Sequence, residues 1–193
     1  MKVVEVRRHS IRKKGRGLSR KGIKLAREIA KTLDSPYDLY ISSPKRRCRK
    51  TMEAFGFNAY VTDNNFSAFT YKKLKPFLSE IKETAKTLGC SSLEACFKLS
   101  ATAKIMKSAG RAYLRALREV ATKLPDGGKA LIVSHSWAIE PAAIVAMKKT
   151  DLSDIGGKLK FCEGVLFYFN GNRLVNVEMK RIKASTDEVN NRQ

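Results

Sequence analysis

The chain contains only two histidines in 193 residues, and both are flanked by side chains that can bind an anion. His9 follows two arginines in the stretch "VRRHS", and His135 lies between two serines in "LIVSHS". Neighbouring cations lower the pKa of a histidine because they disfavour its protonated form. A histidine kept neutral in this way can act as a nucleophile while arginines hold the anion that it attacks. The alternative is a pair of structural histidines on a basic surface.

A third stretch, "SSPKRRCRKTMEAF", predicts a helix with Ser43 as its N-cap and Pro44 in its first position. Lysines and arginines crowd the first two turns of this helix, where positive charge opposes the helix dipole. A bound phosphate would relieve that conflict, because its oxygens accept hydrogen bonds from free backbone N–H groups and from arginine side chains. The stretch is therefore a candidate phosphate-binding element.

Strand and helix signals alternate around these stretches and predict an α/β fold. Ligands of open α/β sheets bind outside the carboxyl ends of the strands, and both histidines fall at such ends. We expect a three-layer α/β/α sandwich with a mostly parallel central sheet and a C-terminal hairpin. The predicted strands are "MKVVEVRR", "YDLYIS", "NAYVTD", "KALIVSHS" and the hairpin "GVLFYFNGNRLVNVEM", with Asn170-Gly171 at its turn.

We expect these elements to form a single domain over residues 1–193. Ser19 is the predicted N-cap of the first helix, and another helix is predicted over 139–148. Residues 64–124 form a predicted helical insertion or cap, and the tail from about 182 to 193 is predicted to fray. The helical signal of the cap is weakest at Pro76, at 89–92 and at Gly110.

The net charge of +21 favours anionic partners, namely phosphorylated substrates, nucleic acid or acidic membrane surfaces. A solvated basic face would explain most of this excess. Nucleic acid is the weaker alternative, because the basic stretches contain few aromatic residues and no known nucleic-acid motif. No apolar run approaches the ~18 residues of a membrane span and no signal peptide is visible, so we expect a cytoplasmic protein without membrane contact. The oligomeric state stays open.

The cysteines indicate neither a metal site nor a disulfide framework. They are scattered, without a CxxC motif, and with two distant histidines they make no convincing zinc pattern. We expect free thiols, although two disulfides would also be compatible, and we expect no metal ion or other cofactor. Cys48 could be reactive or a buried helix thiol, and Trp137 is interpreted as a core residue rather than part of a pocket mouth. The four cysteines are Cys48, Cys90, Cys96 and Cys162.

The stretches "VRRHS", "ISSPKRRCRKTMEA" and "LIVSHS", in this order and spacing, resemble the three motifs of the histidine phosphatase superfamily, whose fold is phosphoglycerate-mutase-like. The stretch "LSRKGIKLAREIA" also resembles a helix of that family. The resemblance covers residues 1–60 and 125–148 well and the middle of the chain poorly. It implies an enzyme that transfers a phosphoryl group through a phosphohistidine, without a metal.

The resemblance implies a role for each matched residue. His9, preceded by Arg8, would be the nucleophile that becomes phosphorylated. Arg47, rather than Arg46, would clamp the phosphoryl group, because the spacing from Ser-Ser-Pro selects it. His135 would bind and polarise the same group.

Three further residues surround these positions. Arg12 would be an additional phosphate ligand in the acid-phosphatase branch of the family, but it also fits an ordinary basic loop. Ser136 follows the second histidine and is a candidate substrate-binding residue. Arg7 is expected to face solvent or a carboxylate instead of the substrate.

The chain departs from the family pattern in two places. Ser10 replaces the usual glycine, which is tolerable if the backbone there avoids a positive φ. The usual proton donor is also missing, since no carboxylate stands at the expected place after the third strand or directly after His135. Glu80 and Glu140 are the candidate donors, although a surface position is the simpler interpretation of both. Asp63 and Glu83 are weaker candidates of the same kind.

A missing acid matters little for a good leaving group, so it favours a phosphatase over a mutase. We expect a metal-independent phosphatase that hydrolyses a phosphomonoester or phosphoramidate of a small molecule or a phosphoprotein. A phosphoglycerate-type mutase is the enzymatic alternative. A catalytically weak module that binds phosphate or nucleic acid is the alternative from another class.

Overall fold

The computed structural model describes residues 1–13, 17–67 and 71–182, and its centre is a six-stranded sheet in the order β5-β4-β6-β1-β7-β8. Strands β5, β4, β6 and β1 run parallel, whereas β7 and β8 form an antiparallel hairpin against β1. This arrangement confirms the predicted mostly parallel sheet with a C-terminal hairpin. The strands of this sheet are β1 (Lys2–Arg8), β4 (Leu39–Ser42), β5 (Val61–Thr62), β6 (Lys129–Ser134), β7 (Gly164–Asn170) and β8 (Arg173–Lys180).

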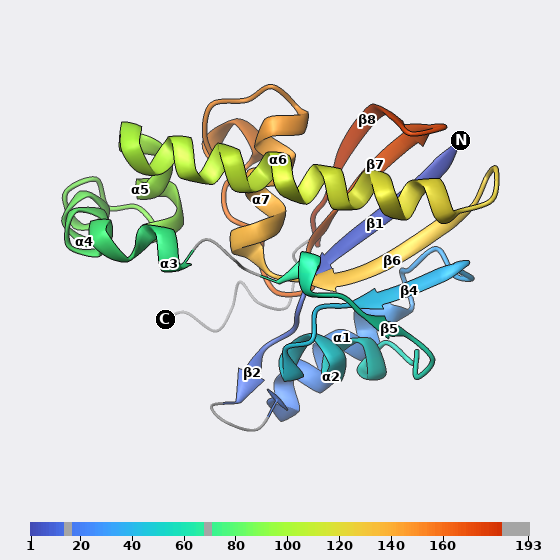
Figure 1. Cartoon of the computed structure of the whole chain (residues 1–193). Coiled ribbons are helices and arrows are strands. Elements are labelled where there is room, and N and C mark those ends of the chain that lie inside the picture. Colours follow the sequence, from blue (N-terminus) through green and yellow to red (C-terminus); the bar gives the residue numbers. More distant parts are fainter. Residues whose placement is uncertain (14–16, 68–70, 183–193) are drawn as a thin grey trace.

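Helices cover both faces of the sheet, as expected for an α/β/α sandwich (Figure 1). Helices α1 (Arg20–Ala30) and α2 (Arg46–Ala54) lie on one face, and α6 (Ser100–Lys123) and α7 (Ser136–Ala146) lie on the other. The short helices between β5 and α6 project beyond the carboxyl ends of the parallel strands (Figure 1). These are η1 (Asn64–Phe66), α3 (Tyr71–Leu74), η2 (Lys75–Phe77), α4 (Leu78–Thr87) and α5 (Ser92–Lys98).

The central strand β6 is apolar on both faces because both faces are covered. Successive side chains of a strand point to opposite sides. Ala130 and Ile132 therefore pack in the core beneath α6 and α7, while Leu131 and Val133 pack in the core beneath α1 and α2. The remaining short elements are the two-stranded ribbon of β2 (Arg12–Lys13) and β3 (Gly17–Leu18), and η3 (Ser153–Ile155).

The helix start predicted at Ser19 is confirmed. The Ser19 hydroxyl accepts a hydrogen bond from the backbone N–H of Gly22 at 3.0 Å. A Cβ atom at Gly22 would lie 2.1 Å from the carbonyl oxygen of Ile11, so only glycine lets α1 approach the chain this closely after the first strand. The segment that carries His9 is thereby packed against α1.

Three predicted boundaries are wrong. Helix α2 begins at Arg46, with Lys45 in an extended conformation as the N-cap residue, because Ser43 and Pro44 continue the turn after β4. Helix α7 begins at Ser136 instead of 139, since the His135 carbonyl already accepts hydrogen bonds from the next turn, and the helix continues through Pro141. The hairpin turn consists of Gly171-Asn172, one residue later than predicted, because Asn170 still pairs with Arg173.

The predicted weak points of the cap have different outcomes. Pro76 lies in η2, and residues 88–91 separate α4 from α5, so both breaks are confirmed. Gly110 does not interrupt α6. It lies where α6 packs closely against α7, since a Cβ atom at this position would be 2.3 Å from the carbonyl oxygen of Pro141. The third predicted strand is reduced to the two residues of β5. The predicted frayed tail lies outside the described residues, apart from Ile182.

Candidate active site

The parallel strands β1, β4 and β6 end at the same edge of the sheet. The three sequence motifs, which follow these strands, therefore lie together at this edge. Arg8 at the end of β1 pairs with Ser134 at the end of β6, and Ser42 at the end of β4 pairs with Val133. Helices α2 and α7 both begin here, so the positive ends of two helix dipoles meet at the same place. Such an edge is suited to hold an anion.

His9 follows β1 and is 7% exposed. Its Nδ1 lies 2.8 Å from the carbonyl oxygen of Ser10. A carbonyl can only accept, so Nδ1 carries the ring hydrogen and Nε2 carries the free lone pair. The pKa of His9 is lowered to about 3, chiefly by burial and also by the charges of Arg47 and Arg8, against the opposing effect of the Ser10 carbonyl. His9 is therefore a neutral base with its lone pair on Nε2.

Ser10 occupies its position without the backbone conformation that glycine usually provides, because its φ is not positive. Its side chain donates a 2.7 Å hydrogen bond to the Gly22 carbonyl, and its backbone N–H donates to the Thr51 hydroxyl at 2.9 Å. These bonds tie the residue after His9 to both α1 and α2. The serine thus fixes the loop that a glycine would leave freer.

His135 stands opposite, with its ring centroid 5.4 Å from that of His9. Arg47 donates from Nη2 to its Nδ1 at 2.9 Å, and Ser43 Oγ lies 2.9 Å from its Nε2. An arginine can only donate, so the hydrogen of the neutral ring is on Nε2 and points to Ser43. The pKa of His135 is lowered to about 2, chiefly by burial and secondly by the charge of Arg47. The two histidines thus carry their hydrogens on opposite ring nitrogens.

Serine hydroxyls extend this arrangement away from the sheet. Ser43 Oγ lies 3.2 Å from Ser67 Oγ, and Ser67 is buried just after η1. Ser134 donates to the Phe66 carbonyl at 2.7 Å, which holds η1 against the end of β6. Sequence reasoning assigned Ser43 only as a helix cap and did not single out Ser67. No local signal marks Ser67, because its partner is 24 residues away.

The cysteines are all free. Cys48 is buried in α2, and its Sγ lies 3.5 Å from Nε2 of His135. Burial raises the pKa of its thiol to about 12, so it is present as a thiol at neutral pH. It is thus a buried helix thiol, the second of the two interpretations above.

Arg8 turns away from the sheet edge toward the loop before β7. Its Nη1 donates to the Leu159 carbonyl, and its guanidinium carbon lies 4.1 Å from the centroid of the Phe161 ring. Its buried Nε has no hydrogen-bond partner among the described residues. Phe161 also lies beside His9, with ring centroids 5.9 Å apart. Phe161 thus contacts both the arginine and the histidine of the first motif, a contact that no local pattern predicts.

Glu140 is fully buried, so its interpretation as a surface carboxylate is wrong. Its Oε1 accepts a 3.0 Å hydrogen bond from the Leu159 N–H, while Oε2 has no partner among the described residues. The pKa of Glu140 is raised to about 8, because the effect of burial outweighs the opposing effects of hydrogen bonds and the nearby Arg8. The Leu159 peptide therefore lies between a protonated carboxyl and an arginine. Glu80, the other candidate donor, is exposed on α4.

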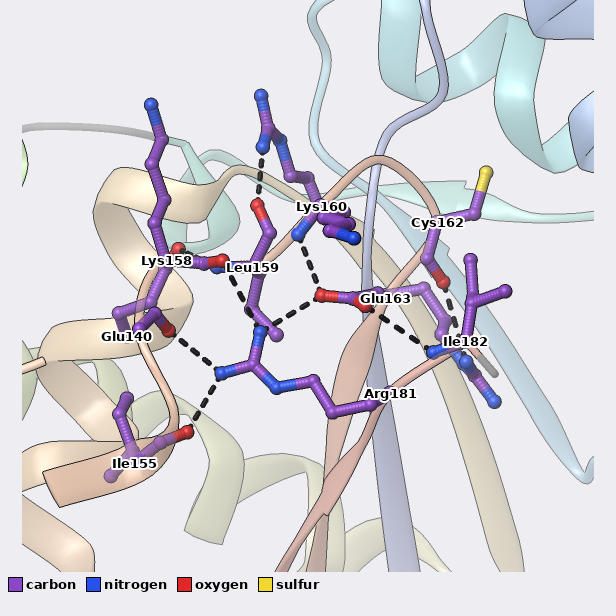
Figure 2. Close-up of polar contacts among 12 residues, drawn as sticks. Glu140, Ile155, Lys158, Leu159, Lys160, Cys162, Glu163, Arg181 and Ile182 are labelled. Carbon is purple, nitrogen blue, oxygen red and sulfur yellow. Dashed lines mark hydrogen bonds and ion pairs between the residues drawn. The ribbon is translucent and has the colours of Figure 1, made fainter. Parts of the chain in front are cut away.

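Arg181, directly after β8, fastens the loop that holds Arg8 (Figure 2). Its Nη2 donates to the carbonyls of Ile155 and Gly157, both at 2.7 Å, and its Nη1 donates to the Lys158 carbonyl at 3.2 Å. Nη1 also forms a 2.8 Å ion pair with Glu163, which is almost fully buried. Arginine supplies the five donors in a rigid fork that such a set of acceptors requires. Sequence reasoning missed this residue.

The other predicted site residues have varied positions. Arg12 is exposed on β2, and its charge helps to lower the pKa of His9. Ser136 is buried as the first residue of α7. Arg7 forms a buried 2.5 Å ion pair with Glu5, which confirms that it faces a carboxylate. Trp137 is half-buried: it packs against the hydrophobic core and also lines a cavity beside the site, so its interpretation as a core residue is only partly right.

Within the described ranges, no three His, Cys, Asp or Glu side chains come together as metal ligands. No helix in the same part of the chain combines the length and apolar character needed to cross a bilayer.

The profile of the histidine phosphatase superfamily (branch 1) matches residues 5–158. This range includes both histidines and the Ser-Ser-Pro motif. No curated protein sequence matches the chain significantly.

Several solved structures share the fold. One is a phosphoserine phosphatase from Entamoeba histolytica in complex with 3-phosphoglyceric acid, which has a TM-score of 0.67 and 16% identity over 95% of this chain and 98% of that chain. A mycobacterial glucosyl-3-phosphoglycerate phosphatase in complex with VO3 has a TM-score of 0.60 and 15% identity over 96% and 100% of the two chains. A phosphoglycerate mutase from Bacillus anthracis has a TM-score of 0.57 and 19% identity over 92% and 91%.

Proposed function

Since this chain belongs to the histidine phosphatase superfamily, we propose that it is a metal-independent phosphatase that hydrolyses a phosphomonoester or phosphoramidate through a phosphohistidine on His9. The hydrogen bond from His9 Nδ1 to the Ser10 carbonyl carries this proposal. It leaves the lone pair on Nε2, and the low pKa of the ring keeps that lone pair available. The nucleophile is thus prepared before substrate binds.

In the first step, the Nε2 lone pair attacks phosphorus in line with the leaving atom. The N–P bond forms as the bond from phosphorus to the leaving atom breaks, and that atom, the ester oxygen of a phosphomonoester or the nitrogen of a phosphoramidate, takes the electron pair. In the second step, water attacks phosphorus, the P–N bond breaks, and its electron pair returns to Nε2. A proton of the water passes to the phosphate or to solvent, and the enzyme is restored.

Arg47 and His135 would hold the transferring group during both steps. Phosphoryl transfer spreads charge over three equatorial oxygens, so fixed donors account for much of the catalysis. The Nε2–H of His135, which donates to Ser43 in the free site, would turn its donation to a phosphoryl oxygen. The N-termini of α2 and α7, including Ser136, add backbone donors at the same edge. Arg12 would add a further cation from β2.

The leaving group decides how much acid catalysis is needed. Glu140 is protonated at neutral pH, but it is fully buried in α7, where its Oε1 accepts a hydrogen bond from the Leu159 N–H in the loop that holds Arg8. Glu80 is exposed on α4. We therefore assign neither as a dedicated donor, and we expect good leaving groups such as aryl oxides, carboxylates and imidazole.

Trapping the intermediate tests this function. Acid-labile, base-stable phosphate should appear on wild-type enzyme quenched during turnover of acetyl phosphate or p-nitrophenyl phosphate, and peptide mapping should locate it at His9. His9→Ala should lose both the label and the turnover. Arg49→Ala is a matched control, because Arg49 is exposed on the same helix as Arg47. Full turnover by His9→Ala would refute the proposal, and transfer of the label to an isomeric phosphoglycerate would identify a mutase instead.

A further inference from the structure

A cavity of about 300 Å³ adjoins the phosphoryl site on the side of α6. Ser67 lines it, and Ser67 Oγ lies 3.2 Å from Ser43 Oγ, which in turn lies 2.9 Å from His135 Nε2. Trp137 and Ala138, in the first turn of α7, form another part of its wall. A group attached to a phosphoryl held at His135 would therefore extend into this space.

The wall of the cavity is largely apolar. Ala109 and Ala112 lie three residues apart on one face of α6 and present only methyl groups. Trp137 and Tyr113 contribute aromatic side chains. An aromatic ring is well suited to such a lining, because rings gain from apolar contact and from offset or edge-to-face contacts with other rings.

Charge is scarce in the same wall. Among the described lining residues, Lys73 is the one charged side chain, and it is exposed on α3. No Asp or Glu is among them, so an ammonium group would lose its water without gaining a counter-charge. Asn65 and Ser108 can donate and accept hydrogen bonds, but their side chains are uncharged. The lining thus disfavours amino-acid phosphates such as phosphoserine.

The volume sets the size of the group. A protein cavity of about 150 Å³ is enough for benzene. The space here accommodates one substituted ring or two fused rings. We propose that this cavity receives the leaving group of the substrate, and that the substrate class is an aryl phosphomonoester. The inference rests on the proposed phosphatase function and adds the chemistry of its leaving group.

Two substrates separate shape from reactivity. Phenyl phosphate and hexafluoroisopropyl phosphate release oxygens of similar acidity, but only the first offers a planar ring. We expect kcat/KM to be about tenfold higher for phenyl phosphate, the scale on which pocket contacts discriminate. O-phosphoserine should be the poorer substrate in the same comparison. An equal or higher value for the fluoroalkyl ester would overturn the assignment.

Filling the cavity tests the position of the ring. Ala112→Leu should lower kcat/KM for phenyl phosphate about tenfold and leave acetyl phosphate, whose acetate barely enters the cavity, nearly unchanged. Ala101→Leu is the matched control, because Ala101 is exposed on α6 and does not line the cavity. Equal loss on both substrates, or no loss on phenyl phosphate, would contradict the proposal. Failure of the wild type on acetyl phosphate would instead count against the phosphatase function itself.

A binding measurement keeps the inference testable without turnover. Trp137 is the single tryptophan of the chain and lines the cavity, so its fluorescence reports occupation directly. Phenylphosphonate, which cannot be hydrolysed, should change this fluorescence at concentrations where methylphosphonate does not. The same response is expected in His9→Ala, and its absence would overturn the inference.

The source of the ring is decided by a further pair of substrates. Free O-phosphotyrosine and a phosphotyrosine peptide carry the same aryl phosphate. Turnover of the free compound above hexafluoroisopropyl phosphate would support the proposal, and comparable turnover of the peptide would indicate that the ring arrives on a protein. Turnover of neither above the fluoroalkyl ester would contradict it.

Discussion

Arg47 donates from Nη2 to Nδ1 of His135 over 2.9 Å, although 88 residues separate them in the chain. The bond directs one side of the guanidinium to the histidine and fixes the opposite ring nitrogen as the one that carries hydrogen. An arginine held in this way is positioned for a phosphoryl group before the group arrives, so its loss should affect the transition state more than the free protein.

Arg47→Ala should lower kcat/KM for p-nitrophenyl phosphate by ~10²–10³-fold, the typical cost of losing one preorganised donor. Arg46→Ala and Arg49→Ala should have small effects, because both side chains are exposed on α2. Steady-state kinetics of the three variants provide the measurement. A dead Arg46→Ala beside an active Arg47→Ala would show that the motif is displaced by one residue.

The two histidines should occupy opposite tautomers in solution. Nitrogen NMR of the imidazole rings should show Nδ1–H for His9 and Nε2–H for His135, since their partners are a carbonyl acceptor and an arginine donor. Both rings should stay neutral at pH 5, because burial and neighbouring arginines lower their pKa values to about 3 and 2. With only two histidines, His135→Gln assigns the spectrum. Protonation of His9 near pH 6.5 would contradict the buried, cation-flanked site.

Glu140 should make stability fall as pH rises. Its pKa is about 8 in the folded protein and near 4.5 when unfolded, so only the folded state keeps the proton between these values. The stabilisation is complete below pH 4.5 and is lost as pH rises through 8. Glu140→Gln removes this dependence, while the opposite contribution of the histidines, which is lost as pH falls below 6.5, is the same in both proteins.

Urea denaturation at pH 5, 6.5 and 8 measures this effect. The free energy of unfolding of the wild type, relative to Glu140→Gln, should decrease by roughly 3–4 kcal/mol between pH 5 and 8. Glu80→Gln should follow the wild type, because Glu80 is exposed. Parallel curves for the wild type and Glu140→Gln would mean that the carboxyl is not protonated in the fold.

Arg181→Ala should lower kcat about tenfold, because it frees the loop that holds Arg8 and Phe161. Arg181→Lys should restore only part of the rate, since one ammonium cannot reach all four oxygens. Arg173→Ala is the control, because Arg173 is exposed at the start of β8, the strand that Arg181 follows. Unchanged kcat in Arg181→Ala would show that the loop holds its position without the clamp.

Activity should survive EDTA and be inhibited by vanadate. Arginines take the place of the cation that other phosphotransferases use, and vanadate imitates the pentacoordinate phosphorus. Inhibition should be competitive with substrate and should weaken strongly in Arg47→Ala but not in Arg49→Ala. Loss of activity on chelation that Mg²⁺ or Zn²⁺ restores would contradict the proposal.

The strand ends and the site motifs could be predicted because both are local properties of the chain. Apolar runs such as Ala130–Val133 require a covered strand, and the polar residues that follow mark its end. Parallel strands place their carboxyl ends at one edge, so His9 and His135 had to lie near each other once β1 and β6 were neighbours. Ser19 likewise caps its helix through a hydrogen bond from the backbone N–H of Gly22, only three residues further along the chain.

Contacts between distant residues were decided by the tertiary structure. Glu140 is interpreted from the sequence as a surface carboxylate, because an unpaired acid is rarely buried, but the packing of the apolar helix α7 against the loop before β7 buries it completely. Arg8 turns to Leu159, 151 residues away, and Arg181 closes that loop from the opposite end of the chain. Local propensity and periodicity specify which elements form. The tautomers, the buried charges and the shape of the cavity depend on how those elements pack, because each arises from atoms that meet only in the folded protein.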